Sequence, residues 1–150
     1  MTDLNEIYNS RIMELAADIG PARRLADPDA TASAHSKLCG STVVLALKVR
    51  DGHLTDYAQT VKACLLGQAS ASIVEHNIVG SSADELRRVA AEMRRMLKEN
   101  GAPPNGRWAD LAVLEPVREV RARHASTMLV FDAVEKALDS IKAKEAATTA

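Results

Sequence analysis

Aromatic side chains are scarce in this sequence of 150 residues, of which they make up only 3%. The four aromatic residues are Tyr8, Tyr57, Trp108 and Phe131. Because hydrophobic residues still make up 47% of the chain, the core must be built mainly from Leu, Val, Ile, Met and Ala. A chain of this length buries enough apolar surface to fold without disulfides, and we expect residues 1–150 to form a single domain.

Three further features are missing, and each excludes a class of protein. The 19 Lys and Arg residues are balanced by 20 Asp and Glu, which argues against broad nucleic-acid binding. No apolar run approaches the length that crosses a membrane, so we expect no membrane partner. The N-terminus, Met1–Glu6, is polar and acidic, unlike a secretory signal, and we therefore expect a cytoplasmic protein.

Cysteine is also rare, with Cys39 and Cys64 as the two examples. A structural disulfide between them is disfavoured in a cytosolic protein, where thiols are kept reduced. Composition alone favours two buried thiols that act as small hydrophobic side chains over a paired metal or redox role.

The first half of the chain is predicted to form a helix, a short strand and a β-hairpin. The helix is indicated by apolar residues at steps of three and four that end at Gly20-Pro21. The hairpin is indicated by β-branched runs on both sides of Asp51-Gly52, a strong signal for a tight turn. The predicted elements are a helix over Leu4–Ile19, a short strand around Thr31–Ser36 within an otherwise irregular segment 20–36, and strands over Thr42–Arg50 and about His53–Val61.

The second half is predicted to be helical. Ser82-Ala-Asp-Glu85 has the pattern of a capping box, which marks the start of a helix. The predicted helices are Cys64–Val79, one from Ser82 with Leu86, Val89, Met93, Met96 and Leu97 on its core side, a short one over Trp108–Glu115 before Pro116, and a last one that buries Met128, Leu129, Phe131, Val134 and Leu138. We expect the tail 142–150 to fray and to be disordered. This order of elements predicts an α+β fold, a three-stranded antiparallel sheet with helices packed on one face.

The two cysteines flank the predicted hairpin. Cys39 precedes the first long strand, and Cys64 lies where the second strand gives way to a helix. Because a hairpin returns the chain to the edge that it left, the two thiols have the chance to meet at one end of the sheet. Unpaired N–H groups and the positive end of the dipole at a helix N-terminus favour the thiolate, which is the form that binds metal or attacks sulfur.

Histidines supply further candidate ligands. His124 is predicted at or just before the start of the last helix, where it is either a metal ligand or simply an exposed histidine. His35 lies four residues before Cys39 and is a further candidate. We assign His53 and His76 to the surface.

Three motifs in order give the chain a family resemblance. Cys39-Gly40-Ser41 is similar to a Cys-Gly-Asp motif before a strand, and Ala63-Cys64 followed by Gln68–Ser72 is similar to a Gly-Cys pair followed by Ala-Ser-x-Ser. Ser126–Leu129 with Asp132-Ala133 is similar to the region that carries a third cysteine in that family. On these motifs the chain resembles the iron–sulfur cluster assembly scaffolds of the IscU, SufU and NifU N-terminal type, over nearly its whole length.

The resemblance implies a function. Scaffolds of this family receive sulfur from a cysteine desulfurase, assemble a cluster and hand it to apo acceptor proteins, so a scaffold rather than an enzyme is expected. The implied cargo is a [2Fe–2S] cluster or zinc, with Cys39 and Cys64 as thiolate ligands and His124 as the third ligand. Cys64 is also the candidate acceptor of persulfide sulfur.

The sequence departs from the family pattern at the site itself. Ser41 replaces the aspartate of Cys-Gly-Asp, and a gapless match of the last helix puts Ser126 at the third cysteine and Ala125 at its neighbouring histidine. Two thiolates are fewer than the four ligands that a cluster or structural zinc usually takes.

His124 is a candidate replacement ligand, but its position sets a condition. It lies two residues before Ser126, and two residues turn a side chain by about 200° in a continuous helix, so His124 reaches the site only if the helix begins after it. A second hypothesis is that the protein is a cluster-free interaction module that kept the scaffold fold and regulates a desulfurase.

Overall fold

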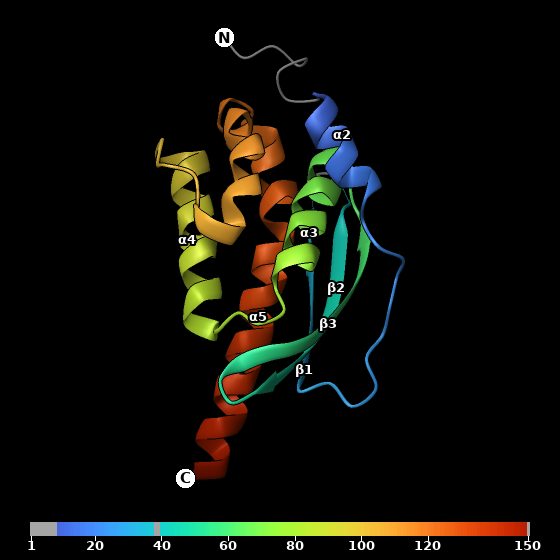
Figure 1. Ribbon diagram of the computed structural model, residues 1–150, viewed down its shortest axis with the longest axis vertical. Helices are drawn as coiled ribbons and strands as arrows, with labels where there is room; N and C mark the ends of the chain where they lie inside the picture. The colour runs from blue at the N-terminus through green and yellow to red at the C-terminus, as the bar shows by residue number, and fades with distance from the viewer. Residues whose placement is uncertain (1–8, 38–39, 150) are drawn as a thin grey trace.

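The chain folds into a three-stranded antiparallel sheet with helices packed on one face (Figure 1). This arrangement confirms the predicted α+β fold class. A computed structural model describes residues 9–37 and 40–149. The strands, in the order β1-β2-β3, are β1 (Ala30–His35), β2 (Thr42–Arg50) and β3 (His53–Lys62). The α-helices are α2 (Ser10–Ala17), α3 (Leu65–Asn77), α4 (Ala83–Lys98) and α5 (His124–Thr149), and two 3-10 helices are η1 (Gly106–Glu119) and η2 (Arg121–Arg123).

The alternation of side chains along β2 decides which face of the sheet is covered. Val43, Leu45 and Leu47 point inward and are at most 1% exposed, whereas Val44 between them is 46% exposed. The predicted β2–β3 turn is present, and both Asp51 and Gly52 have positive φ angles, as a two-residue hairpin turn requires.

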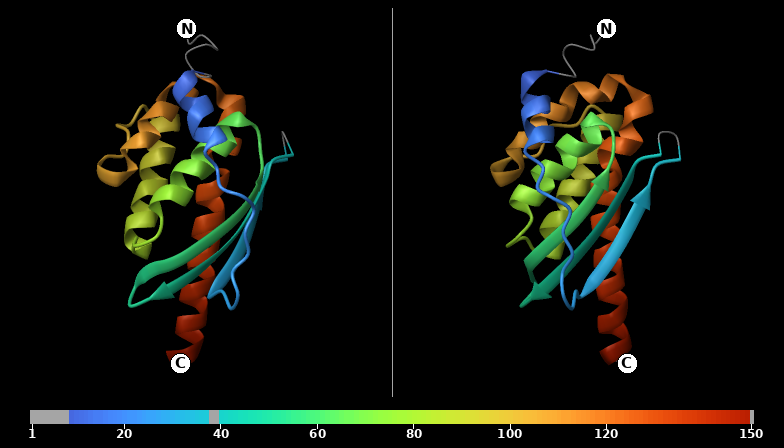
Figure 2. Two further views of the ribbon diagram at one scale, coloured as in Figure 1. Left: turned by 45° about the vertical axis from the view of Figure 1, so that its right-hand side comes forward. Right: turned by 90° about the vertical axis from the view of Figure 1, so that its right-hand side faces the viewer.

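The helices form the other layer of the molecule. In Figure 2 the sheet is seen from its open side, with α3 and α5 behind it and α4 and η1 farther out. The irregular segment 18–29 runs along the open face of the sheet, where the backbone N–H of Arg23 donates to the carbonyl of Gln59 at 3.3 Å. The sheet is therefore covered fully on one face and only partly on the other.

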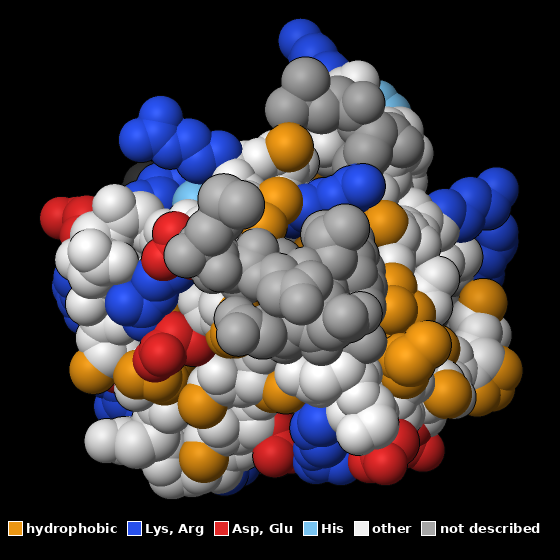
Figure 3. Space-filling view, turned by 90° about the horizontal axis from the view of Figure 1, so that it is seen from above, with side chains coloured by type: hydrophobic (Ala, Val, Ile, Leu, Met, Phe, Trp, Pro, Cys, Tyr) orange, Lys and Arg blue, Asp and Glu red, His pale blue; other side chains and the backbone are white. Residues whose placement is uncertain are grey.

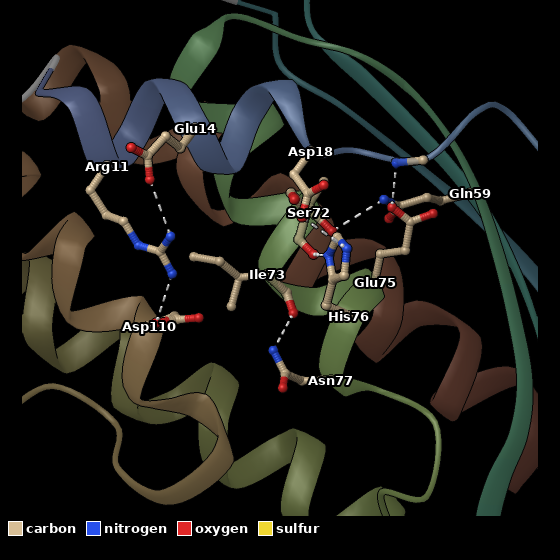
Figure 4. A network of polar contacts seen from close by, with 12 residues as sticks. Arg11, Glu14, Asp18, Gln59, Ser72, Ile73, Glu75, His76, Asn77 and Asp110 are labelled. Carbon is tan, nitrogen blue, oxygen red and sulfur yellow. Dashed lines mark hydrogen bonds and ion pairs between the residues drawn. The ribbon is translucent and has the colours of Figure 1, made fainter.

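Polar contacts hold α2 and the segment after it against α3 (Figure 4). Asn9 caps α2 by accepting a hydrogen bond from the N–H of Ile12 at 3.0 Å. The contacts to other elements are Arg11 with Asp110 at 3.3 Å, Asp18 with His76 at 3.3 Å, and the Gly20 N–H with the Glu75 carboxylate at 2.9 Å. The predicted start of this helix at Leu4, with Tyr8, lies outside the described residues.

A buried polar cluster joins β3 to α3. The hydroxyl of Tyr57 donates to Gln59 Oε1 at 2.6 Å, and Gln59 Nε2 donates to the carbonyl of Ala71 at 3.1 Å. Burial raises the pKa of Tyr57, and the negative charge of Glu75 raises it further. The phenol therefore stays protonated and serves as a hydrogen-bond donor, and the amide of Gln59 joins sheet and helix.

The start of α4 matches the predicted capping box in its first half only. Ser82 Oγ accepts a hydrogen bond from the N–H of Glu85 at 3.2 Å. The Glu85 carboxylate instead accepts hydrogen bonds from Ser81, Arg107 and Trp108, which links α4 to η1. Burial raises the pKa of Glu85, but these hydrogen bonds and the Arg107 charge lower it by more, so its pKa lies below the usual value.

The segment before α5 corrects the prediction of a short helix that ends before Pro116. It is a 3-10 helix that continues through Pro116 to Glu119. Its four buried residues are Trp108, Leu111, Leu114 and Val117, each at most 2% exposed. Their spacing of three residues equals one turn of a 3-10 helix, so a 3-10 helix aligns them on a single face against the core.

The tail 142–150, which the sequence predicts to fray, is helical as far as Thr149. Helix α5 continues to Thr149 and extends past the sheet (Figure 1). Lys144 Nζ donates to the carbonyl of Asp29 at 2.8 Å, and Lys136 Nζ donates to that of Ser33 at 3.2 Å. These contacts hold α5 along the edge strand β1. Within the described ranges, no helix is both long and apolar enough to span a membrane.

Candidate functional site

The register of the sheet brings the two predicted cysteine segments to one end of the molecule. Thr42, the first residue of β2, pairs with Lys62, the last residue of β3. The chain therefore enters β2 and leaves β3 at the same end, where α3 and α5 also begin (Figure 2). Cys39 itself lies outside the described residues.

The β1–β2 connection is closed by backbone hydrogen bonds on both sides of the undescribed residues. The N–H of Ser36 donates to the carbonyl of Ser41 at 2.8 Å, and the N–H of Gly40 donates to that of Ser36 at 2.9 Å. Gly40 has a φ of 72°, a left-handed conformation that favours glycine. Ser41, which the resemblance aligns with the aspartate of the Cys-Gly-Asp motif, is only 3% exposed.

Cys64 is the N-cap residue of α3, with extended backbone angles φ −66° and ψ 172°. Its carbonyl accepts the first helical hydrogen bond, from the N–H of Gln68 at 2.9 Å. Its thiol is free and partly exposed. The thiol Sγ donates to Ser126 Oγ at 3.4 Å, so Cys64 faces the first turn of α5.

Ser126 is therefore the residue of α5 that the structure brings to Cys64. Its side chain is buried, and Ser126 Oγ donates to the carbonyl of Arg123 at 3.2 Å. The same carbonyl accepts a second hydrogen bond from Thr127 Oγ1 at 2.8 Å. A hydroxyl, which is a weak ligand for iron and zinc, thus lies where the family motif has a thiolate.

His124 does not satisfy the condition that would bring it to the same place. It is already helical, with φ −60° and ψ −45°, so helix α5 begins at His124 and not after it. His124 Nε2 lies 3.0 Å from the carbonyl oxygen of Val117 and 3.2 Å from that of Arg118. Because carbonyls only accept hydrogen bonds, Nε2 carries the hydrogen, and metal ligation by His124 would fall to Nδ1.

Small side chains allow α3 to approach α5 closely beside the site. A Cβ atom on Gly67 would lie 2.7 Å from Ala63 Cβ and 3.2 Å from the carbonyl oxygen of Ser126. Ser70 Oγ donates to the carbonyl of Thr127 at 2.8 Å, and both residues are fully buried. Part of the Gln68–Ser72 motif therefore positions the first turn of α5 against α3.

The other predicted histidines lie apart from this contact. His35 is exposed at the same end of the sheet, with Nδ1 3.3 Å from Thr42 Oγ1. His53 and His76 are exposed, as predicted. In the part of the chain that the structure describes, which leaves out Cys39, no three His, Cys, Asp or Glu side chains are close enough together to hold a metal ion.

Comparison with known proteins establishes the family. No family model matches the chain. The solved structure of a nitrogen-fixing NifU-like protein (N-terminal) from Brucella abortus is 55% identical, with a TM-score of 0.92, over 94% of this chain and 98% of that one. The chain belongs to the NifU-like scaffold family.

Two further relatives agree with this assignment to the scaffold family. A curated iron–sulfur cluster assembly scaffold protein IscU from Thermotoga maritima is 24% identical over 135 residues, which are 90% of this chain and 94% of the relative. The putative SufU scaffold from Fervidobacterium islandicum AW-1 shares the fold, with a TM-score of 0.82 at 17% identity over 91% of this chain and 99% of that one.

Proposed function

We propose that this member of the scaffold family assembles an iron–sulfur cluster at the end of the sheet where β2 begins and β3 ends. The sulfur comes from a cysteine desulfurase, and the finished cluster passes to apo acceptor proteins. Cys64 carries the proposal, because it combines a free, partly exposed thiol with a helix N-terminus beside the connection that holds Cys39. Cys39 and Cys64 would be the thiolate ligands.

Sulfur transfer to Cys64 needs no added oxidant. The Cys64 thiolate attacks the outer sulfur of a desulfurase persulfide, the S–S bond of that persulfide breaks, and the desulfurase cysteine leaves as a thiolate. Cys64 then carries the sulfur as its own persulfide. Partial exposure of Cys64 gives the partner access to the thiol.

The protein itself supplies fewer ligands than a cluster or zinc usually takes. A small number of protein ligands suits a scaffold that must release its cargo. Ser126 contacts Cys64 where the family has a third cysteine, and a serine hydroxyl does not replace that thiolate. His124 was the predicted third ligand, but α5 begins at His124, so the proposed protein ligands for iron, zinc or a [2Fe–2S] cluster are Cys39 and Cys64. Water or a partner side chain would complete the coordination.

Metal and sulfide analysis of anaerobically purified protein tests the proposal. We expect iron with sulfide, or zinc, in the wild-type protein and loss of both in the Cys39→Ser plus Cys64→Ser variant. His124→Gln should leave the stoichiometry unchanged, as should the control His53→Gln, because α5 begins at His124 and not after it. Unchanged metal and sulfide in the double cysteine variant would refute the ligand assignment.

A second candidate function follows from the same contact. If Ser126 beside Cys64 leaves too few ligands, the protein is a cluster-free module that binds a desulfurase and regulates it. Co-purification with a desulfurase in the absence of metal, with a changed desulfurase rate, would favour this function. A rate unaffected by the protein would argue against it.

A further inference from the structure

An open polar groove lies between α4, η1, η2 and the first turn of α5, beside the candidate site. Its volume is about 740 Å³. Its lining includes the side chains of Arg94, Lys98, Arg118 and Arg121, and also Ala125, the residue immediately before Ser126. The groove therefore adjoins the first turn of α5 on the face that carries His124 and Met128. Ser126, which contacts Cys64, is not part of its lining.

Cations exceed carboxylates along the groove. Two carboxylates line it, and one of them, Asp132, is already ion-paired to Arg94 at 3.0 Å. Lys98 and Arg121 are exposed and form no ion pair within the described chain. Two positive charges are thus available there to an incoming anion, against the single carboxylate of Glu119.

The other two cations stabilise the walls of the groove. Arg94 contacts both Asp132 and Glu135 of α5, which ties α4 to α5. Arg118 bonds Asn100 Oδ1 at 3.2 Å and pairs with Glu115 at 3.2 Å, which ties η1 to the end of α4. Arg94 and Arg118 are therefore held in the walls of the groove by these contacts, which leaves Lys98 and Arg121 as the cations available to a partner.

We propose that this groove docks an acidic segment of the protein that delivers sulfur, with carboxylates on Lys98 and Arg121. The proposal rests on the proposed function, because it names the chemistry of the partner at that same site. An open, polar and cationic groove suits an extended peptide better than a small apolar ligand, whose pockets are enclosed and mostly apolar. Complementary charge would speed the encounter and fix the partner's orientation at the first turn of α5.

A labelled hexaglutamate peptide, followed by fluorescence anisotropy at low salt, probes the groove directly. We expect Lys98→Glu plus Arg121→Glu to weaken binding by about tenfold or more, and added salt to weaken binding to the wild-type protein. The matched control is Arg50→Glu plus Lys142→Glu, which makes the same change in net charge at exposed positions outside the groove. Arg50 is the last residue of β2, and Lys142 lies in the C-terminal half of α5.

Three outcomes would overturn the groove assignment. They are absence of peptide binding, equal weakening in the groove and control variants, and tighter groove-dependent binding of an oligothymidylate of the same length. The last result would indicate nucleic acid as the occupant. Lys and Arg side chains project from several points around this end of the molecule, so the control variant is needed to separate the groove from general charge (Figure 3).

Sulfur transfer from a cysteine desulfurase separates failure of the groove from failure of the proposed function. We expect the groove variant to need about tenfold more scaffold for half-maximal transfer, with the maximal rate unchanged. Cys64→Ser should abolish transfer but still bind the peptide. Transfer that survives Cys64→Ser would refute the proposed function alone, and an unchanged half-maximal concentration in the groove variant would refute the groove alone.

Discussion

Replacing Gly67 by alanine tests how tightly the start of α3 packs against its neighbours, Ala63 just before the helix and the first turn of α5. The added Cβ would lie 2.7 Å from Ala63 Cβ and 3.2 Å from the Ser126 carbonyl oxygen. The first contact requires the segment before α3 to shift, and the second requires α3 and α5 to move slightly apart. Overpacking of this kind destabilises proteins by about 1–3 kcal/mol. Alanine favours a helix over glycine by at most about 1 kcal/mol. We therefore expect the variant to lose about 1–2 kcal/mol of unfolding free energy.

Urea unfolding followed by the fluorescence of Trp108 measures this loss. Trp108 is the only tryptophan and is 2% exposed, so its emission reports the packing of η1 on the core. Thermal unfolding should show a fall in Tm of roughly 2–8 °C. Adding Ala63→Gly to the Gly67→Ala variant removes the atom nearest to the new Cβ and should restore part of the lost stability. A Gly67→Ala protein as stable as wild type, or more stable, would refute the close packing of Gly67 against Ala63 and Ser126.

Three other substitutions make separate predictions. Ser126→Cys places a second thiol beside Cys64 and should tighten zinc binding by at least about tenfold in a competition titration with a chromophoric chelator, whereas unchanged affinity would place the metal elsewhere. Ser70→Ala removes a buried hydrogen bond to Thr127 and should cost about 1 kcal/mol in urea unfolding, so a neutral effect would contradict that bond. The pKa of Glu85 is lowered in the folded state, so its contribution is complete above the unfolded pKa of about 4.3 and is lost as pH falls through the folded pKa. Glu85→Gln should therefore destabilise by about 1–2 kcal/mol near neutral pH and flatten the decline in acid, and an unchanged pH profile would count against this linkage.

The sheet and the amphipathic helices were predictable because their signals are local. Strand β2 alternates between the core and the open face, and Asp51-Gly52 supplies the positive φ angles of the turn. Helix α4 shows both its Ser82 cap and a clear apolar stripe. These patterns depend only on neighbouring residues, so the sequence alone was sufficient.

The two differences in secondary structure have different causes. The 3-10 helix η1 had a visible signal, the spacing of three from Trp108 to Val117, which a search for the α-helical period overlooks. The continuation of α5 had none, because Lys144 is held by Asp29, a residue far away in the sequence. Only the folded chain brings those two residues together.

The site was predictable in part. The family motif put Ser126 at the third ligand position, and the structure places it against Cys64. The position of His124 depended on where α5 begins, which is fixed by the preceding η2 and by the carbonyls of Val117 and Arg118. The cationic groove was not predictable, because Lys98 and Arg121 come together only when α4, η1 and α5 pack.

Transfer of sulfur to Cys64 tests the central claim most directly. The protein is incubated anaerobically with a cysteine desulfurase and cysteine and is then digested without reduction. The masses of the peptides that contain Cys64 are measured by mass spectrometry. We expect the Cys64 peptide to gain the mass of one sulfur atom and to lose it on reduction. We also expect that sulfur to enter an iron–sulfur cluster when ferrous iron is added together with an electron donor that reduces the persulfide sulfur to sulfide. A Cys64 peptide that gains no sulfur while the desulfurase turns over, together with no cluster, would contradict the assignment of this protein as a working scaffold.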